Sequence, residues 1–172
     1  MQAPERKGRT VRDSAVCALA PERLFDLLAD PIERQTWDLC PPYITQEPLQ
    51  AAPGPALRGP RYSARGTARG IRFVGTTLVM AADRPRRYQT SSEMTFERAY
   101  PDAWAVEEYL IEPKGEGSLV RYTMRVATVP GTGAFLFGLL NALLEPFVAP
   151  NGAKRNFRNT LRYAEKHAEV SA

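Results

Sequence analysis

The sequence predicts a single α+β domain in which a curved antiparallel sheet is covered by a long C-terminal helix. Three observations support this fold class. The region from about residue 60 to residue 129 contains strand-like alternating stretches separated by short turns. Two short helical patterns precede this region, and one long helical pattern follows it. The length of 172 residues and the apolar fraction of 44% are those of one globular domain.

The first elements are predicted to be a strand and a short helix. Residues 10–19 alternate between apolar and polar side chains, which favours a strand, and Cys17 fits a small core position in it. Residues 21–30 favour a helix, because Pro21 suits the first helical position and the leucines that follow lie on one face.

A second short helix is expected directly after the first. Asp30 resembles an N-cap, Pro31 suits the first helical position, and Glu33 completes a variant of the capping box. The helix is predicted to run through Trp37. We interpret Trp37 as a core residue beneath this helix; the alternative is that it overhangs the mouth of a cavity.

Residues 60–82 are predicted to form two strands joined by a tight turn at Arg69-Gly70. A two-residue turn places Tyr62 opposite Thr77 and Gly66 opposite Phe73. Directly opposed residues share a face of the sheet. The predicted buried face carries Tyr62, Ala64, Ile71, Phe73 and Val79, and the predicted wet face carries Arg61, Arg65 and Arg72.

Three further strands are expected before the terminal helix. They cover residues 86–96, 103–112 and 118–129. The last two are predicted to form a hairpin whose loop is "PKGEG", residues 113–117.

The most apolar run, "GAFLFGLLNALLEPFVAP", spans residues 133–150. From Gly133 to Val148 a helix is about 24 Å long, shorter than the roughly 30 Å hydrocarbon core of a bilayer. It also carries Glu145, so we predict a buried helix that packs across the apolar face of the sheet and closes a pocket, not a membrane span. Pro146 and Pro150 are expected to kink or interrupt it.

Residues 153–168 continue the helix with an apolar stripe that includes Phe157 and Leu161. The remaining surface of this part is basic. We interpret it as a solvated helix face; the alternative is contact with an anionic partner. The basic side chains are Lys154, Arg155, Arg158, Arg162 and Lys166.

Composition narrows the classes of function. The net charge is +4, and the arginines are spread along the chain without a nucleic-acid-binding pattern, so no nucleic-acid partner is expected. His167 is the only histidine, interpreted as a surface residue, and there are two cysteines. Histidine triads and histidine-rich metal centres are thereby almost excluded, and no metal or organic cofactor is expected. The N-terminus does not have the pattern of a signal peptide, so we expect a cytoplasmic protein. We also expect a monomer or a weak homodimer.

Several stretches resemble a known superfamily. They are "APERLFDLLADPIERQTWD" after the first strand, "DRPRRYQTSSEM" in mid-chain, "YLIEPKGEGSLVRYTMRV", and "FRNTLRYAEKHAE" near the end. The order of the predicted elements and the short sequence patterns in these stretches resemble the helix-grip fold of the START and birch-pollen-allergen superfamily. The resemblance is strongest to its polyketide cyclase/dehydrase-like branch (SRPBCC). The resemblance covers about residues 10–168, which we expect to form one domain between an N-terminal tail, residues 1–9, and a short C-terminal tail, residues 169–172.

The resemblance implies that a hydrophobic molecule is held between the sheet and the terminal helix. One hypothesis is an enzyme that cyclises or dehydrates a polyketide-like or other aromatic or lipidic substrate. The alternative is a non-catalytic carrier or sequestering protein for such a molecule. A partner-binding module that uses an exposed sheet face is a third possibility. Fold alone does not decide between them.

The hairpin after residue 103 supplies the predicted catalytic pair. With residues 113–117 as the loop, Glu108 lies opposite Tyr122 on a face that is otherwise apolar. Glu108 is therefore predicted to enter the cavity, where burial would raise its pKa and suit it to proton transfer. The alternative is that Glu108 only anchors a water or a hydroxyl, or pairs with an arginine. The predicted ligand-binding residues are Tyr62, Phe73, Thr77, Tyr88, Trp104, Val106, Met124, Phe135, Leu139 and Leu143.

Overall fold

The computed structural model describes residues 9–38, 44–49, 51, 54–68, 71–97, 102–129 and 135–170, with the side chains of the last segment described from residue 151 onward. The first elements are β1 (Arg9–Cys17), α1 (Pro21–Ala29), α2 (Pro31–Trp37) and β2 (Ile44–Gln46). The strands β3 (Arg61–Ala68), β4 (Ile71–Asp83), β5 (Arg87–Phe96), β6 (Asp102–Lys114) and β7 (Gly117–Val129) follow. The last element is α3 (Phe135–Val170).

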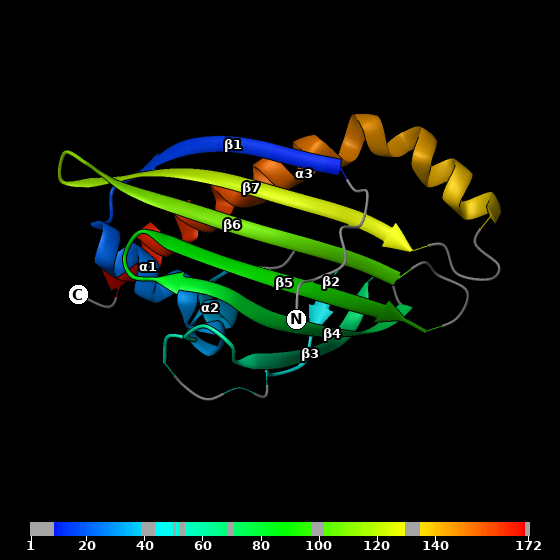
Figure 1. The fold of residues 1–172 in the computed structure, drawn as a ribbon, viewed down its shortest axis with the longest axis horizontal. Coiled ribbons are helices and arrows are strands. Elements are labelled where there is room, and N and C mark those ends of the chain that lie inside the picture. Colours follow the sequence, from blue (N-terminus) through cyan, green and yellow to red (C-terminus); the bar gives the residue numbers. More distant parts are fainter. Residues whose placement is uncertain are drawn as a thin grey trace.

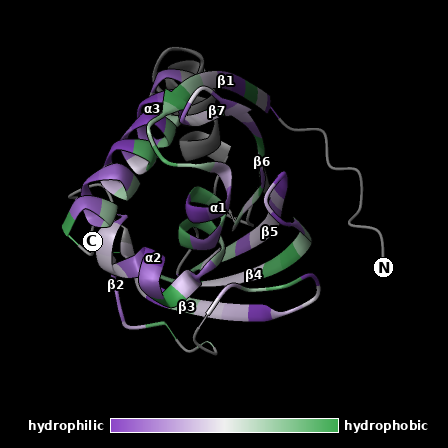
Figure 2. Cartoon of the chain, turned by 90° about the vertical axis from the view of Figure 1, so that its left-hand side faces the viewer, coloured by the Kyte–Doolittle hydropathy of each residue, from purple (hydrophilic) through white to green (hydrophobic). Residues whose placement is uncertain are grey.

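The strands form one antiparallel sheet in the order β1-β7-β6-β5-β4-β3-β2. The three helices lie on one side of it, and the sheet curves around them (Figures 1 and 2). The predicted fold class, a curved antiparallel sheet with a long terminal helix and two short helices after the first strand, is confirmed. Ligands and proton-transfer groups must therefore be sought on the concave face.

The junction of α1 and α2 follows directly from the local sequence. Oδ1 of Asp30 accepts the backbone N–H groups of Ile32 and Glu33, each at 3.0 Å. These bonds satisfy donors that a helix N-terminus otherwise leaves unpaired. Pro31 begins α2, as the sequence predicts. The capped turn lets α1 and α2 follow each other without a linker.

The predicted register of the β3–β4 hairpin is confirmed. Tyr62 pairs with Thr77, and Gly66 pairs with Phe73. Phe73 and Val79 are buried, whereas Arg61, Arg65 and Arg72 are exposed. The hairpin therefore presents its aromatic side to the concave face.

The predicted register of the β6–β7 hairpin is wrong by one residue. Lys114 pairs with Gly117, so the turn is the two residues Gly115 and Glu116, not the five-residue loop expected. Gly115 has a φ of 62°, a conformation that two-residue hairpins need and that glycine adopts readily. Because side chains alternate along a strand, a shift of one residue moves every β6 side chain to the opposite face.

The helix α3 is continuous through Pro146 and Pro150 and is bent rather than interrupted. In Figure 1 its gold first part and its orange-to-red second part run in different directions. Phe157, Leu161 and Ala164 of the second part are buried in the core. The predicted packing of residues 133–150 across the sheet falls outside the described side chains and stays a prediction.

Trp37, predicted to be a core residue, and His167, predicted to be a surface residue, contact each other between α2 and α3. Trp37 is buried, which confirms its interpretation as a core residue. Its ring stacks on that of His167, with centroids 6.2 Å apart, and Nε2 of His167 lies 3.0 Å from Oε1 of Glu33. The interpretation of His167 as a plain surface residue is therefore wrong, because it joins the two helices.

An ion pair fastens α3 to the edge strand β1. Nε of Arg158 lies 2.9 Å from Oδ2 of Asp13. Burial alone would raise the pKa of Asp13, but the hydrogen bonds from Arg158 and from the Ser14 N–H, together with the charges of Arg158 and Lys154, outweigh it and lower that pKa. A carboxyl whose folded-state pKa lies below its unfolded value stabilises the protein above the unfolded pKa and loses this effect as the pH falls.

Asp13→Asn is therefore expected to lower the melting temperature at pH 7. The difference from the wild type should shrink as the pH falls from about 5 to about 3, because the wild-type carboxyl then takes up its proton. Thermal unfolding followed by circular dichroism across this range checks the prediction. A difference that is constant with pH would contradict the role given to the Asp13 charge.

Candidate functional site

A row of tyrosines crosses the concave face. Tyr88 on β5 pairs with Tyr109 on β6, and Tyr109 pairs with Tyr122 on β7. The rings of Tyr109 and Tyr122 lie 5.1 Å apart between centroids. Phe157 of α3 stacks on Tyr122 at 4.8 Å with an interplanar angle of 5°. All three tyrosines are buried, so their hydroxyls need partners inside the protein.

A carboxyl group lies beside this row. Glu107 is one step along β6 on the same face, and its Oε1 accepts the hydroxyl proton of Tyr122 at 2.7 Å. Glu107 is half-buried, so its side chain is not sealed in by packing. A carboxyl held by a phenol on a concave, partly enclosed face is suited to accept a proton from a bound molecule.

A guanidinium reaches the same place from α2. Nη2 of Arg34 donates to the hydroxyl of Tyr109 at 3.2 Å, and Nε of Arg34 donates to Oδ2 of Asp38 at 2.8 Å. Oδ1 of Asp38 accepts the hydroxyl proton of Thr160 on α3 at 2.9 Å. The side chain of Arg34 is only 22% exposed. This chain of hydrogen bonds holds a permanent positive charge at the concave face and links α3 to the sheet.

The fourth tyrosine extends the polar groups toward β3. Tyr62 pairs with Thr77 across β3 and β4, and it lies close enough to Tyr88 for both side chains to influence its pKa. The hydroxyl of Thr77 lies 2.9 Å from that of Ser92 on the next strand. We call Arg34, Tyr62, Thr77, Glu107, Tyr109 and Tyr122 the polar band.

Burial raises the pKa of the phenols of Tyr62, Tyr88, Tyr109 and Tyr122. For Tyr122 the neighbouring Glu107 raises it further. Burial alone would lower the pKa of Arg34, but Tyr109, Asp38 and Glu107 outweigh it and raise that pKa. At neutral pH the phenols are therefore neutral donors beside a fixed cation, an arrangement that stabilises negative charge on a ligand oxygen.

Side chains of the concave face are packed differently on the two sides of the polar band. Toward α1 the concave face is filled by buried side chains such as Phe25, Leu28 and Val120. On the other side Phe73 is buried, but Met94 and Ala105 are only half-buried, so packing is looser around these two described side chains. A groove of about 610 Å³ at that end reaches Phe73 and Phe96, but outward-facing Arg65, Thr67 and Arg72 also line it, so it opens at the edge of the sheet. The concave face thus offers an apolar surface that ends at the polar band.

Other chemistries find little support among the described side chains. Burial raises the pKa of the Cys17 thiol to about 12, and the residue is fully buried, which agrees with the predicted core position. A thiol in that state is a poor nucleophile. In the described part of the chain, no group of three or more histidine, cysteine, aspartate or glutamate side chains could hold a metal ion.

Comparison with protein families decides the family. Residues 9–169 match the family described as polyketide cyclase / dehydrase and lipid transport. The chain belongs to this family. No curated protein gives a significant sequence match.

Solved structures agree on the fold of this family member. Mll3558 from Rhizobium loti has a TM-score of 0.65 at 14% identity, with 91% of this chain and 97% of that chain covered. CV1439 from Chromobacterium violaceum has a TM-score of 0.61 at 16% identity, with 91% and 94% covered. Ara h 8.0201 has a TM-score of 0.61 at 12% identity, with 95% and 99% covered. The predicted membership of the START and birch-pollen-allergen helix-grip superfamily is confirmed, and family and fold together support binding of a hydrophobic ligand.

The structure places the predicted catalytic and ligand-binding residues of this polyketide cyclase-type domain in three groups. The concave face carries Tyr62, Phe73, Thr77, Tyr88, Tyr122 and Met124, as expected. Phe135, Leu139 and Leu143 lie outside the described side chains. Glu108, Trp104 and Val106 lie on the convex face, so their predicted placement is wrong.

The corrected register explains the third group. Glu108 pairs with Thr123 instead of Tyr122, and its Oε1 lies 2.8 Å from Nε of Arg87. Glu107 takes the inward position that was assigned to Glu108. The pairing of Glu108 with an arginine was the alternative named above for this residue.

Sequence reasoning missed Arg34, Asp38 and Tyr109. The predicted register puts Tyr109 on the opposite face of β6 from Glu108, the face expected to be wet, yet Tyr109 is 2% exposed and lies on the concave face. The signal that could have found it is the "KGEG" stretch, because a glycine at the first central position favours a two-residue hairpin turn. For Arg34 and Asp38 the spacing of four residues predicts only that they can pair with each other on a helix.

Proposed function

We propose that the protein binds a hydrophobic, oxygen-bearing small molecule against the concave face and catalyses its ring closure with loss of water. The apolar end of the face would hold the carbon skeleton, and the polar band would hold its oxygens. The observation that carries this proposal is the meeting of Glu107, Tyr122 and Arg34 at the boundary between packed and half-open halves of the face. A polyketide-like or other aromatic precursor has the required chemistry.

The reaction can be written without a cofactor. Glu107 takes a proton from a carbon that lies next to a carbonyl group, and Arg34 stabilises the enolate oxygen that forms. The enolate carbon attacks a second carbonyl carbon of the same molecule, forming the ring bond. The new alkoxide takes a proton from protonated Glu107. Glu107 then takes a second proton from the same carbon and gives it to the hydroxyl group as the C–O bond breaks, so that a carbon–carbon double bond forms and water leaves.

A non-catalytic carrier is the second candidate. Its support is that the hydroxyls of Tyr109 and Tyr122 are bonded to other protein groups, Tyr109 to Arg34 and Tyr122 to Glu107. Such a network is satisfied without any reacting molecule, as a binding cavity requires. In that case the polar band only orients a ligand.

Native mass spectrometry of freshly purified protein separates the two candidates. We expect a bound small molecule whose mass decreases by one water on incubation. A bound molecule that stays unchanged would support the carrier and overturn the catalytic proposal. Protein that repeatedly carries no small molecule, and binds none from a hydrophobic extract of its host, would contradict both.

A further inference from the structure

One buried cation on the concave face has no hydrogen-bond partner among the described residues. Arg9 is the first residue of β1, and Nη1 of its guanidinium group is buried and unbonded. The other described side-chain atom in this state is Nε1 of Trp37, which belongs to a neutral ring. A charged group that is buried without a partner costs far more free energy than a neutral one. An anion next to Arg9 would remove this cost.

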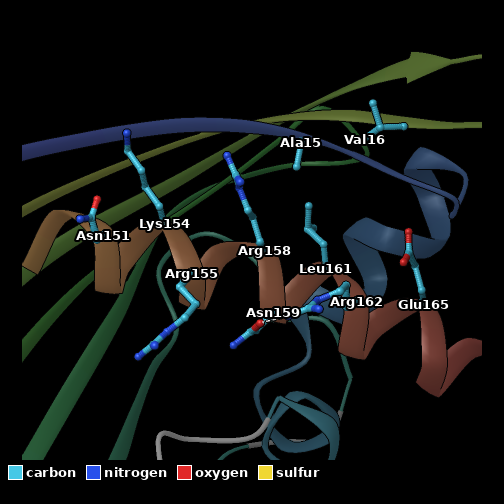
Figure 3. A pocket seen from close by; sticks show the side chains of 10 residues that line it. All are labelled: Ala15, Val16, Asn151, Lys154, Arg155, Arg158, Asn159, Leu161, Arg162 and Glu165. Atoms are coloured by element: carbon cyan, nitrogen blue, oxygen red, sulfur yellow. Dashed lines mark hydrogen bonds between the residues drawn. The ribbon is translucent and has the colours of Figure 1, made fainter. Parts of the chain in front are cut away.

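The alternation of side chains along β1 directs Arg9 toward the concave face. Val11 and Cys17 lie at the same phase and are buried, and Asp13 between them forms the ion pair with Arg158 of α3. Figure 3 shows Arg158 pointing from α3 toward β1. Asp13 is four residues from Arg9, about 13 Å along the strand, so it cannot serve both arginines. Among the described residues, Arg9 is thus the unmatched charge on this side of β1.

A row of half-buried side chains runs from Arg9 across the concave face. In order from β1 to β3, the strand pairs place in this row Arg9, Val126, Ala105, Ser92, Thr77 and Tyr62. All six are half-buried, and the four in the middle are small. The next row toward α1 includes Glu107 together with the buried Val11 and Thr90. An elongated molecule that lies along the first row therefore has one end at Arg9 and its middle beside Glu107.

The charge of Arg9 is balanced best by a single carboxylate. Arg34 also lies at the concave face, but Asp38 already neutralises it, whereas none of the ion pairs between described residues includes Arg9. One carboxylate balances one guanidinium, and its two oxygens fit the planar fork of nitrogens. A phosphate group would bring up to about two charges to one cation.

The buried position of Nη1 limits the kind of partner. No helix in the described part of the chain combines the length and apolar content that a membrane crossing requires. A bilayer that met the domain from outside could not bring its headgroups to a buried nitrogen. A small molecule that enters the concave face can, so the carboxylate belongs to such a molecule.

We propose that the molecule bound at the concave face is a hydrophobic carboxylic acid whose carboxylate is held by Arg9. This inference rests on the function proposed above and narrows its substrate class. Glu107 lies on β6, two strand spacings or about 10 Å from β1, so the carbon that loses a proton lies several bonds from the carboxylate. Arg9 is thus a binding residue that fixes which carbon of the substrate meets Glu107.

Two fluorescent probes that differ in charge test this subsite in the full chain. 1-Pyrenebutyric acid carries a carboxylate at neutral pH, and its methyl ester is neutral. A purely apolar site prefers the ester, because burial of a carboxylate costs free energy. We expect the wild type to bind the acid at least about tenfold more tightly than the ester, the usual effect of a hydrogen bond to a charged group.

Equal affinities for the two probes, or tighter binding of the ester, would overturn the Arg9 subsite and leave the proposed function intact. Binding of neither probe would contradict hydrophobic binding itself, and therefore both proposals.

Paired variants of β1 locate the cation. Arg9→Gln should lower the affinity for the acid by about tenfold or more and change that for the ester by less than about twofold. The matched control is Arg12→Gln, which removes the same charge from an exposed position on the convex face of the same strand and should change neither affinity. A preference for the acid that survives in Arg9→Gln, or that is lost equally in Arg12→Gln, would overturn the proposal.

Melting temperatures separate ligand binding from a structural role of Arg9. Removal of an unpaired buried charge should not destabilise the protein, so Arg9→Gln is expected to melt at the wild-type temperature or above it. 1-Pyrenebutyric acid should raise the melting temperature of the wild type more than that of Arg9→Gln. If Arg9→Gln melted well below the wild type or failed to fold, Arg9 would support the fold instead, and the proposal would be wrong.

Discussion

Glu107→Gln is expected to lower the rate of the proposed ring closure by about 10²- to 10⁴-fold, the usual contribution of a general base. The amide cannot take the proton that the reaction must remove. Its oxygen can still accept the hydroxyl proton of Tyr122, so the melting temperature and the dissociation constant of the bound molecule should change little. Mass spectrometry of the incubated complex gives the rate.

Glu108→Gln is the matched control for this variant. The two glutamates are neighbours in sequence, but Glu108 lies on the convex face and pairs with Arg87 there. Loss of a partly exposed ion pair costs about 0–1 kcal/mol of stability and should leave the rate unchanged. If Glu108→Gln slowed the reaction as much as Glu107→Gln, the proposed role of Glu107 would be wrong.

Phe157→Ala is expected to reduce the free energy of unfolding by about 3–5 kcal/mol, the usual cost of truncating a buried phenylalanine. Phe157 is 2% exposed and stacks on Tyr122, so its loss opens a cavity between α3 and the tyrosine row. Urea unfolding followed by circular dichroism measures the change. Ligand binding should weaken as well, because the ring that supports Tyr122 is gone.

Val170→Ala on the same helix provides the comparison. Val170 is 83% exposed, so its truncation should change stability by less than about 0.5 kcal/mol. A Phe157→Ala variant that lost less than about 1 kcal/mol would contradict the packing of α3 on the sheet, because a buried ring cannot be removed so cheaply.

The parts of the fold that could be predicted depend on local chemistry. The Asp30-Pro31 junction needs only one capping carboxylate and one proline, both visible in four residues of sequence. The β3–β4 register follows from a two-residue turn and an aromatic alternation that agree with each other. The family resemblance rested on the order of such local elements, and the sequence and fold comparisons confirm it.

The face of β6 could not be read from alternation alone. Both of its faces carry apolar side chains: Trp104, Val106 and Leu110 on the convex side, and Tyr109 and Ile111 on the concave side. The two glutamates then fit either choice equally well. The turn determines the register, and a change of one residue in that register moves every side chain of the strand to the opposite face of the sheet.

The missed residues of the candidate site depend on tertiary contacts. Arg34 meets Tyr109 across 75 positions of sequence, and Asp38 meets Thr160 across 122. No periodicity or capping pattern reports such pairs. They arise because α2 and α3 cover the same concave face.

Binding of an aromatic fluorescent probe such as anilinonaphthalene sulfonate to two neighbouring tryptophan variants tests the central claim most directly. Ala105 is half-buried on the concave face beyond the polar band, and Val106 lies on the convex face. If the concave face binds the ligand, Ala105→Trp should weaken binding at least about tenfold, equal to about 1.4 kcal/mol, and Val106→Trp should not change it. The melting temperatures of both variants show that each is folded. Equal affinities for the two folded variants, or a loss confined to Val106→Trp, would contradict the account.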